Sequence, residues 1–85
     1  AAICAAPAVA LEPNGLLEGR AATAHPGFQT RLADQSRASE RVVIDGNCLT
    51  SQGPGTALEL SLTLVECLLG KEKRDAVGAP MVLPA

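Results

Sequence analysis

The sequence predicts an α/β fold, because short strand-like segments alternate with helical segments along its 85 residues. Three observations support this prediction. An apolar strand runs directly into a helix within residues 1–11, two strand-like runs flank an Asp-Gly-Asn turn within residues 41–51, and a leucine-rich helix follows over residues 56–70. A parallel sheet covered by helices on both faces usually needs more chain than this, so we expect the segment to be unstable as an isolated monomer.

The first predicted feature is a sharp bend between a strand over residues 1–3 and a helix over residues 5–11. Pro7 fits this helix because proline is tolerated in a first turn. The bend places Cys4 at a helix N-terminus, where unpaired amides and the helix dipole favour the thiolate that attacks carbonyls or is oxidised. Cys4 is therefore the candidate nucleophile; the alternative is a small buried residue in an alanine-rich segment.

Turns separate this helix from the predicted hairpin. Residues 12–15 (Glu-Pro-Asn-Gly) end the first helix, and residues 25–27 (His-Pro-Gly) form another turn. Phe28 and Leu32 stand at helical spacing in a polar stretch, which predicts a short surface helix and loop over residues 28–40.

The clearest helix is predicted to begin at Thr56 and to end near Gly70. Thr56 and Glu59 have the spacing of a capping box, in which each side chain bonds the backbone amide of the other residue. Three polar residues of this helix, Glu59, Thr63 and Glu66, fall on one stripe. Leucine and valine cover the rest of its circumference, so we expect it to be mostly buried. A short charged helix over residues 71–77 and an extended tail over residues 79–85 follow.

Composition argues against nucleic acid as a partner. The chain has one Phe and no Trp or Tyr to stack on bases, and its net charge of −2 offers no basic surface for phosphates. Three widely spaced cysteines and a single histidine argue against a disulfide framework and against a structural zinc site. No apolar run is long enough to span a membrane. We therefore expect no metal, no membrane partner and a reducing, cytoplasmic compartment, with any organellar targeting segment lying upstream.

Three segments resemble the ThiJ/PfpI superfamily in their order and spacing: Ala-Ile-Cys-Ala-Ala-Pro at residues 2–7, Gly-Leu-Leu-Glu-Gly-Arg-Ala-Ala-Thr-Ala-His-Pro-Gly-Phe at residues 15–28, and Asp-Gly-Asn-Cys-Leu-Thr-Ser-Gln-Gly-Pro-Gly-Thr-Ala-Leu-Glu-Leu at residues 45–60. The chain is most similar to the branch of the Parkinson-disease-associated protein deglycase and its plant and bacterial homologues. The resemblance implies a flavodoxin-like α/β sandwich (class I glutamine amidotransferase-like), with residues 1–85 as the C-terminal half of a single domain that starts at the nucleophile elbow. It also implies a strand over residues 21–24 and a homodimer in the full-length form.

The same resemblance implies roles for three site residues. Cys4 would be the nucleophile, His25 would move protons, and the backbone amide of Ala5 would face the developing oxyanion. The acidic partner of the thiol would lie upstream. Ala5 also stands where protease-like relatives have a histidine, so peptide hydrolysis is disfavoured. The alternative for His25 is a surface histidine at a strand end.

The function that the resemblance implies is that of a cofactor-independent glyoxalase or deglycase, acting on small reactive carbonyl substrates such as methylglyoxal, glyoxal and their early adducts. The alternative is an oxidative-stress sensor or redox-regulated chaperone that uses the same thiol, and a third reading is a truncated product with a structural role. Residues 53–56 (Gly-Pro-Gly-Thr) could cradle an anion, but a tight turn into the helix is favoured. Cys48 and Cys67 are expected to be packing residues.

Overall fold

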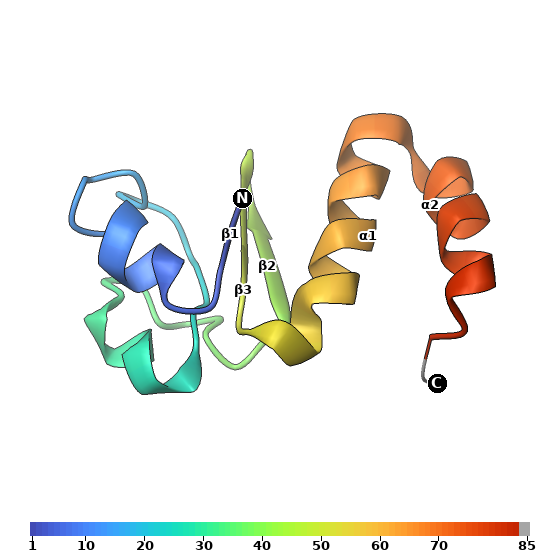
Figure 1. Ribbon diagram of the computed structural model, residues 1–85. Helices are drawn as coiled ribbons and strands as arrows, with labels where there is room; N and C mark the ends of the chain where they lie inside the picture. Colours follow the sequence, from blue (N-terminus) through green and yellow to red (C-terminus); the bar gives the residue numbers. More distant parts are fainter. Residues whose placement is uncertain (84–85) are drawn as a thin grey trace.

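A computed structural model describes residues 1–83, and it has a three-stranded sheet at its centre (Figure 1). The strands are β1 (Ala2–Ile3), β2 (Val42–Asp45) and β3 (Cys48–Ser51), in the spatial order β1-β3-β2. Strand β3 runs parallel to β1 and antiparallel to β2. The α/β class and the hairpin over residues 41–51 are thereby confirmed.

Helices lie on both faces of this sheet (Figure 1). On one side are α1 (Ala57–Leu69) and, packed against its outer face, α2 (Lys71–Gly78). The shorter helical pieces are a π-helical segment at Pro7–Leu11 and 3₁₀ turns at Pro26–Arg31, Pro54–Thr56 and Ala79–Met81. The pieces at Pro7–Leu11 and Pro26–Arg31 lie on the face of the sheet opposite α1. Every predicted helix is present, and α1 ends as expected, with Gly70 at φ +92° as its C-cap.

The core under the short helices combines three alanines with two leucines. It consists of Ala8, Leu17, Ala22, Ala24 and Leu32, with Leu11, Phe28 and Cys48 packed against it. Small side chains let the connecting segments approach the sheet closely, and this position of Cys48 confirms its predicted packing role.

The predicted strand over residues 21–24 is wrong. These residues are buried beside the sheet but form no strand, and the amides of Ala21 and Thr23 bond to side chains instead of to a neighbouring backbone. The amide of Ala21 donates to Asp45 Oδ2 at 2.8 Å, and the amide of Thr23 donates to Thr50 Oγ1 at 3.0 Å. These two amides are therefore not available to a ladder of backbone hydrogen bonds.

The predicted capping box is also wrong. Thr56 is the N-cap of α1, but its side chain makes no capping hydrogen bond to the helix. Its Oγ1 instead accepts from the amides of Gln52 and Gly53, at 3.2 and 3.1 Å, and lies 2.6 Å from Ser51 Oγ. Glu59 binds Arg41 instead, at 2.7 Å. Thr56 thus fixes the turn that precedes the helix.

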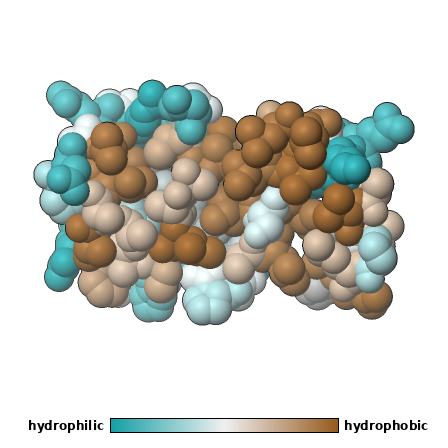
Figure 2. All heavy atoms as spheres, turned by 45° about the horizontal axis from the view of Figure 1, so that its top comes forward, coloured by the Kyte–Doolittle hydropathy of each residue, from teal (hydrophilic) through white to brown (hydrophobic). Residues whose placement is uncertain are grey.

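Helix α1 is less buried than its apolar sequence predicts. Leu62 and Thr63 are buried, whereas Leu58, Leu68 and Leu69 are exposed by 52%, 72% and 66%. Figure 2 shows the resulting apolar surface over α1. The reason is geometric: the sheet covers one side of α1 and α2 covers another, which leaves the remaining apolar sides open. Cys67 is exposed on this helix, so its predicted role as a buried packing residue is wrong.

The predicted extended tail over residues 79–85 is replaced at its start by the 3₁₀ turn Ala79–Met81, and residues 84–85 lie outside the described range. Among residues 1–83, no helix is long and apolar enough to cross a membrane.

Candidate active site

Cys4 occupies a sharp bend at the carboxyl end of β1, as predicted. Its φ of +64° is in the left-handed region, which non-glycine residues rarely adopt because the Cβ atom meets the following carbonyl oxygen. Such a conformation costs about 1–2 kcal/mol and persists only where the surroundings hold it in place. The next residues enter the helical segment Pro7–Leu11, with Pro7 in its first turn. The thiol is free and half-buried.

Two hydrogen bonds hold the backbone of Cys4 in this conformation. Its amide donates to the carbonyl of Ser51, at the end of β3, at 3.1 Å. Its carbonyl accepts from the amide of His25 at 2.7 Å. The bend is therefore tied both to the sheet and to the candidate histidine, two segments that are distant in sequence.

His25 lies beside this bend, and its imidazole is exposed. Its Nδ1 accepts a hydrogen bond from the amide of Gly27 at 3.1 Å, and its ring meets Phe28 edge-on at a centroid distance of 6.2 Å. A Cβ atom added at Gly53 would lie 3.8 Å from His25 Cδ2, so the turn after β3 passes close to the ring. The structure thus brings together Cys4, His25 and the turn into α1.

Ala5 follows Cys4 at the start of the helical segment. Its carbonyl accepts from the amides of Ala8 and Val9, both at 3.0 Å. Its own amide donates to no backbone carbonyl elsewhere in the described range of 1–83, as the first amides of a helix generally do not. This amide is therefore available to an external acceptor next to the thiol.

Amides in and next to the turn at residues 53–56 form hydrogen bonds within the chain. The amides of Gln52 and Gly53 donate to Thr56 Oγ1, and the amide of Thr56 donates to the carbonyl of Gly53 at 2.9 Å. Because these amides already have acceptors within the chain, the prediction of a tight turn, in preference to an anion-binding cradle, is confirmed.

Sequence reasoning missed a set of contacts around Arg20 and Asp45, here called the clamp, at the start of the buried segment of residues 21–24. Arg20 Nη1 donates to the carbonyl of Asp45 at 2.8 Å, and its guanidinium covers Gly46, where a Cβ atom would come within 2.4 Å of Nη1. The Asp45 carboxylate in turn accepts from the amide of Ala21. This clamp fixes residues 20–25 against the hairpin and so helps to place His25. Its only sequence signal was the Asp-Gly turn, which does not reveal the arginine.

A second missed feature is the carbonyl of Ala38, on which three side chains converge. Thr23 Oγ1, Gln29 Nε2 and Gln52 Nε2 donate to it at 2.6, 2.9 and 3.2 Å. The three donors come from the buried segment of residues 21–24, from the 3₁₀ helix Pro26–Arg31 and from the residue that follows β3. The Ala38 carbonyl therefore ties the loop that contains it to the three segments that supply these donors.

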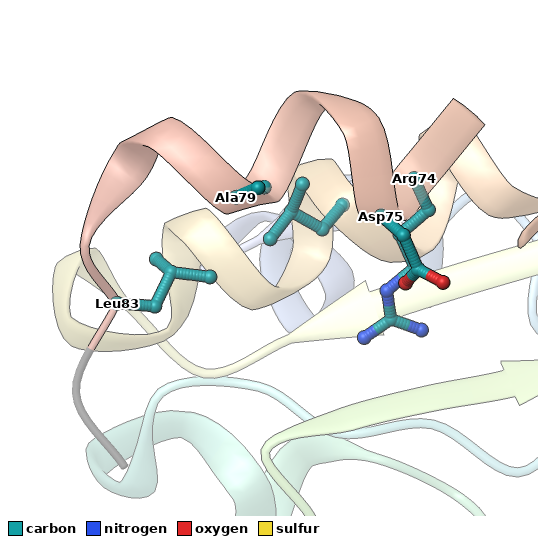
Figure 3. A pocket seen from close by; sticks show the side chains of 6 residues that line it. Arg74, Asp75, Ala79 and Leu83 are labelled. Carbon is teal, nitrogen blue, oxygen red and sulfur yellow. The ribbon is translucent and has the colours of Figure 1, made fainter. Parts of the chain in front are cut away.

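A cavity of about 300 Å³ lies apart from these residues, between α1, α2 and the C-terminal turn (Figure 3). It is lined by Leu62, Arg74, Asp75, Gly78, Ala79 and Leu83. Figure 3 shows Arg74 and Asp75 at one end and Leu83 at the other. The lining offers no thiol, hydroxyl or imidazole, so the candidate chemistry lies at Cys4 and not here.

An α/β sheet with a cysteine at a strained strand-to-helix bend defines a class of elbow-nucleophile proteins. Comparison with known proteins identifies which: the DJ-1/PfpI family model matches residues 1–67, and the chain belongs to this family. The resemblance found in the sequence is thereby confirmed.

Individual relatives agree with this assignment. Protein DJ-1 homolog A of Arabidopsis thaliana is 53% identical over 76 residues, covering 89% of this chain and 19% of that protein. Parkinson disease protein 7 homolog of Danio rerio is 46% identical (98% and 45% covered), and glutathione-independent glyoxalase DJR-1.2 of Caenorhabditis elegans is 37% identical (96% and 44% covered). The structure of oxidized Toxoplasma gondii DJ-1 superposes with a TM-score of 0.90 at 38% identity, covering 99% of this chain and 46% of that one. The chain spans less than half the length of each of these relatives.

Proposed function

We propose that this chain provides the thiol, histidine and oxyanion amide of a cofactor-independent glyoxalase or deglycase that acts on methylglyoxal, glyoxal and their early adducts. The observation that supports this most directly is the strained bend at Cys4, whose carbonyl is bound to the amide of His25 at 2.7 Å. Strain of this kind concentrates at functional sites. The relative named as a glutathione-independent glyoxalase is 37% identical to this chain over 84 residues, which supports the same activity.

The proposed chemistry begins with attack of the Cys4 thiolate on the aldehyde carbon. A carbon–sulfur bond forms, the carbonyl π electrons move to oxygen, and the Ala5 amide is the nearby donor for that oxygen. With methylglyoxal, the C–H bond of the former aldehyde carbon then breaks: its proton leaves, its electron pair forms a C=C bond to the neighbouring carbonyl carbon, and the oxygen of that carbonyl takes up a proton. Protonation of the second carbon and re-formation of C=O at the first then give a thioester, so the first carbon is oxidised and the second is reduced. Water hydrolyses the resulting thioester to lactate and restores the thiol. The oxidation and reduction balance within one substrate, so no redox cofactor is required.

The test is methylglyoxal turnover by a protein that contains the whole family domain. Cys4→Ser should lower the turnover by about 10³-fold or more, as removal of a catalytic nucleophile does. Cys67→Ser is the matched control. Cys67 is an exposed thiol on α1, so its substitution should leave turnover unchanged. Full activity in Cys4→Ser would refute the proposal.

The 85-residue chain alone is proposed to have little activity, because the acidic partner of the thiol is implied to lie in a part of the family domain that this chain does not include. Turnover by the refolded chain at the rate of the whole domain would contradict this.

The second candidate function is oxidation sensing, favoured by the free, half-buried thiol of Cys4 and by the oxidized form of the Toxoplasma relative. Peroxide would transfer one oxygen to the Cys4 sulfur, giving a sulfenate as the O–O bond breaks and water leaves. Cys4 should react before Cys67, although Cys67 is exposed, because Cys4 lies at the strained bend next to the amide of Ala5, whereas Cys67 lies within the regular helix α1. Mass spectrometry after mild peroxide measures the order, and earlier modification of Cys67 would overturn this assignment.

A further inference from the structure

The amide of Gly27 determines which nitrogen of His25 can meet a substrate. The 3₁₀ helix starts at Pro26, which has no amide hydrogen. Gly27 therefore has the first N–H of this helix, and this N–H has no backbone partner within the helix. That N–H donates to His25 Nδ1 at 3.1 Å. A nitrogen that accepts a hydrogen bond carries no proton, so the neutral ring must hold its proton on Nε2.

The remaining contacts of His25 keep the ring in this orientation. Its amide is bound to Cys4, and its carbonyl accepts from the amide of Phe28 at 2.7 Å, so the backbone is fixed on both sides. The Phe28 ring stands edge-on to the imidazole, and Gly53 lies beside Cδ2. With Nδ1 occupied by Gly27, Nε2 is the ring nitrogen left for a substrate.

We propose that Gly27 is a positioning residue, whose amide holds neutral His25 in the Nε2–H tautomer so that the histidine meets a carbonyl substrate as a hydrogen-bond donor and not as a base. The inference rests on the proposed function for the identity of that substrate. In this tautomer, His25 polarises the carbonyl oxygen while the Cys4 thiolate attacks the carbon. Proton abstraction by Nε2 requires the other tautomer, which cannot accept the Gly27 hydrogen bond.

Nuclear magnetic resonance of ¹⁵N-labelled histidine tests this directly in a protein that contains the whole family domain. The His25 signals are assigned by their loss in His25→Gln. At a pH where the ring is neutral, the wild-type spectrum should show the coupling pattern of the Nε2–H tautomer. A predominant Nδ1–H tautomer would overturn the proposal.

Two substitutions at Gly27 identify the group responsible. Gly27→Pro removes the N–H and should shift the neutral ring toward the Nδ1–H tautomer. It should also lower kcat by about 2- to 10-fold, the factor that one neutral hydrogen bond represents. Gly27→Ala is the matched control: it keeps the N–H, and its Cβ would lie 3.4 Å from Nδ1, a tolerable contact. The control should therefore keep the wild-type tautomer.

An unchanged tautomer in Gly27→Pro would refute the role of this amide. If this variant does not fold, the wild-type spectrum alone decides between the two tautomers. Absence of methylglyoxal turnover in a wild-type protein with the Nε2–H tautomer would refute the proposed function and leave the role of Gly27 intact, so the two failures are distinguishable.

Discussion

The two regions of the molecule are stabilised in different ways. The region before α1 contains Cys4 and His25 and is fixed by hydrogen bonds between side chains and backbone across long sequence separations. The region of α1 and α2 has regular helices but leaves large leucines exposed. The backbone around Cys4 and His25 is therefore fixed by contacts within this chain, whereas no part of this chain covers the outer surface of the helices among the described residues.

This difference shows that hydrophobicity and precision of structure are separate properties. The segment beside the sheet is made of alanine and threonine, yet Ala24 and Thr23 are completely buried and bonded in place. Small side chains allow the backbone to approach polar groups closely, and these hydrogen bonds determine the geometry. The leucines of α1 provide apolar area without fixing a partner.

The largest expected effect concerns the role of His25 itself. In a protein with the whole family domain, His25→Ala should lower methylglyoxal turnover by about 10²- to 10³-fold, the usual loss when one hydrogen-bond donor to the developing oxyanion is removed. Oxidation of Cys4 by peroxide should remain near the wild-type rate, because it requires only the thiolate. Kinetic assays and mass spectrometry measure the two effects. An equal loss of both would mean that His25 acts on the thiol and not on the substrate.

Two leucines on α1 sharpen the comparison between regions. Leu62 is 4% exposed and Leu68 is 72% exposed. In a protein with the whole family domain, Leu62→Ala should lower the free energy of unfolding by about 2–5 kcal/mol, because it leaves a cavity. Leu68→Ala is the matched control and should change the free energy of unfolding by no more than about 0.5 kcal/mol. Urea denaturation followed by circular dichroism gives both values, and equal costs would show that the outer surface of α1 is covered.

A smaller effect is expected at Thr56, which fixes the turn between the two regions. Thr56→Val removes the acceptor of the Gln52 and Gly53 amides and leaves the buried Gly53 N–H without its partner. The free energy of unfolding should fall by about 1–3 kcal/mol. Thr56→Ser keeps the hydroxyl oxygen and should retain most of the stability. If valine and serine had equal effects in thermal denaturation, the hydroxyl would not be what fixes this turn.

Periodicity and turn chemistry predicted the regular elements well. The hairpin, α1 and α2 follow from patterns within a few neighbouring residues, and the bend at Cys4 follows from an apolar run that meets small residues and Pro7. Local patterns are sufficient for these elements because their hydrogen bonds join residues that are close in sequence or in register.

Contacts between distant residues were not predictable in the same way. The capping-box pattern at Thr56 and Glu59 failed because Ser51 and Arg41, both outside the helix, bind these side chains instead. The strand over residues 21–24 failed because Asp45 and Thr50 take its amides. Neither competition is visible until the sheet brings these residues together. The same holds for the bond between Gly27 and His25, since a turn sequence does not say which ring nitrogen accepts.

The smallest expected effect concerns an exposed hydrogen bond in the loop after His25. Ser36 Oγ and the Ser36 amide donate to Asp34 Oδ1 at 2.6 and 2.9 Å. These bonds, the side-chain bond first, hold the pKa of the Asp34 carboxyl below its ordinary value. A carboxyl with a lowered folded-state pKa stabilises the fold above its unfolded pKa, and this contribution is lost as the pH falls through the folded pKa.

Ser36→Ala removes the larger of the two bonds, so the pKa of Asp34 should rise toward its ordinary value while the amide bond keeps part of the shift. Titration of the carboxyl carbon by nuclear magnetic resonance measures this. Ser61→Ala on α1 is the matched control, because its hydroxyl bonds to the Ala57 carbonyl and should leave Asp34 unchanged. The stability of the fold near neutral pH should hardly change, since the group is fully exposed and solvent screens it. A pKa that does not move in Ser36→Ala would show that the hydroxyl has no part in holding this carboxylate, and a large loss of stability would show that the loop around His25 depends on this one exposed bond.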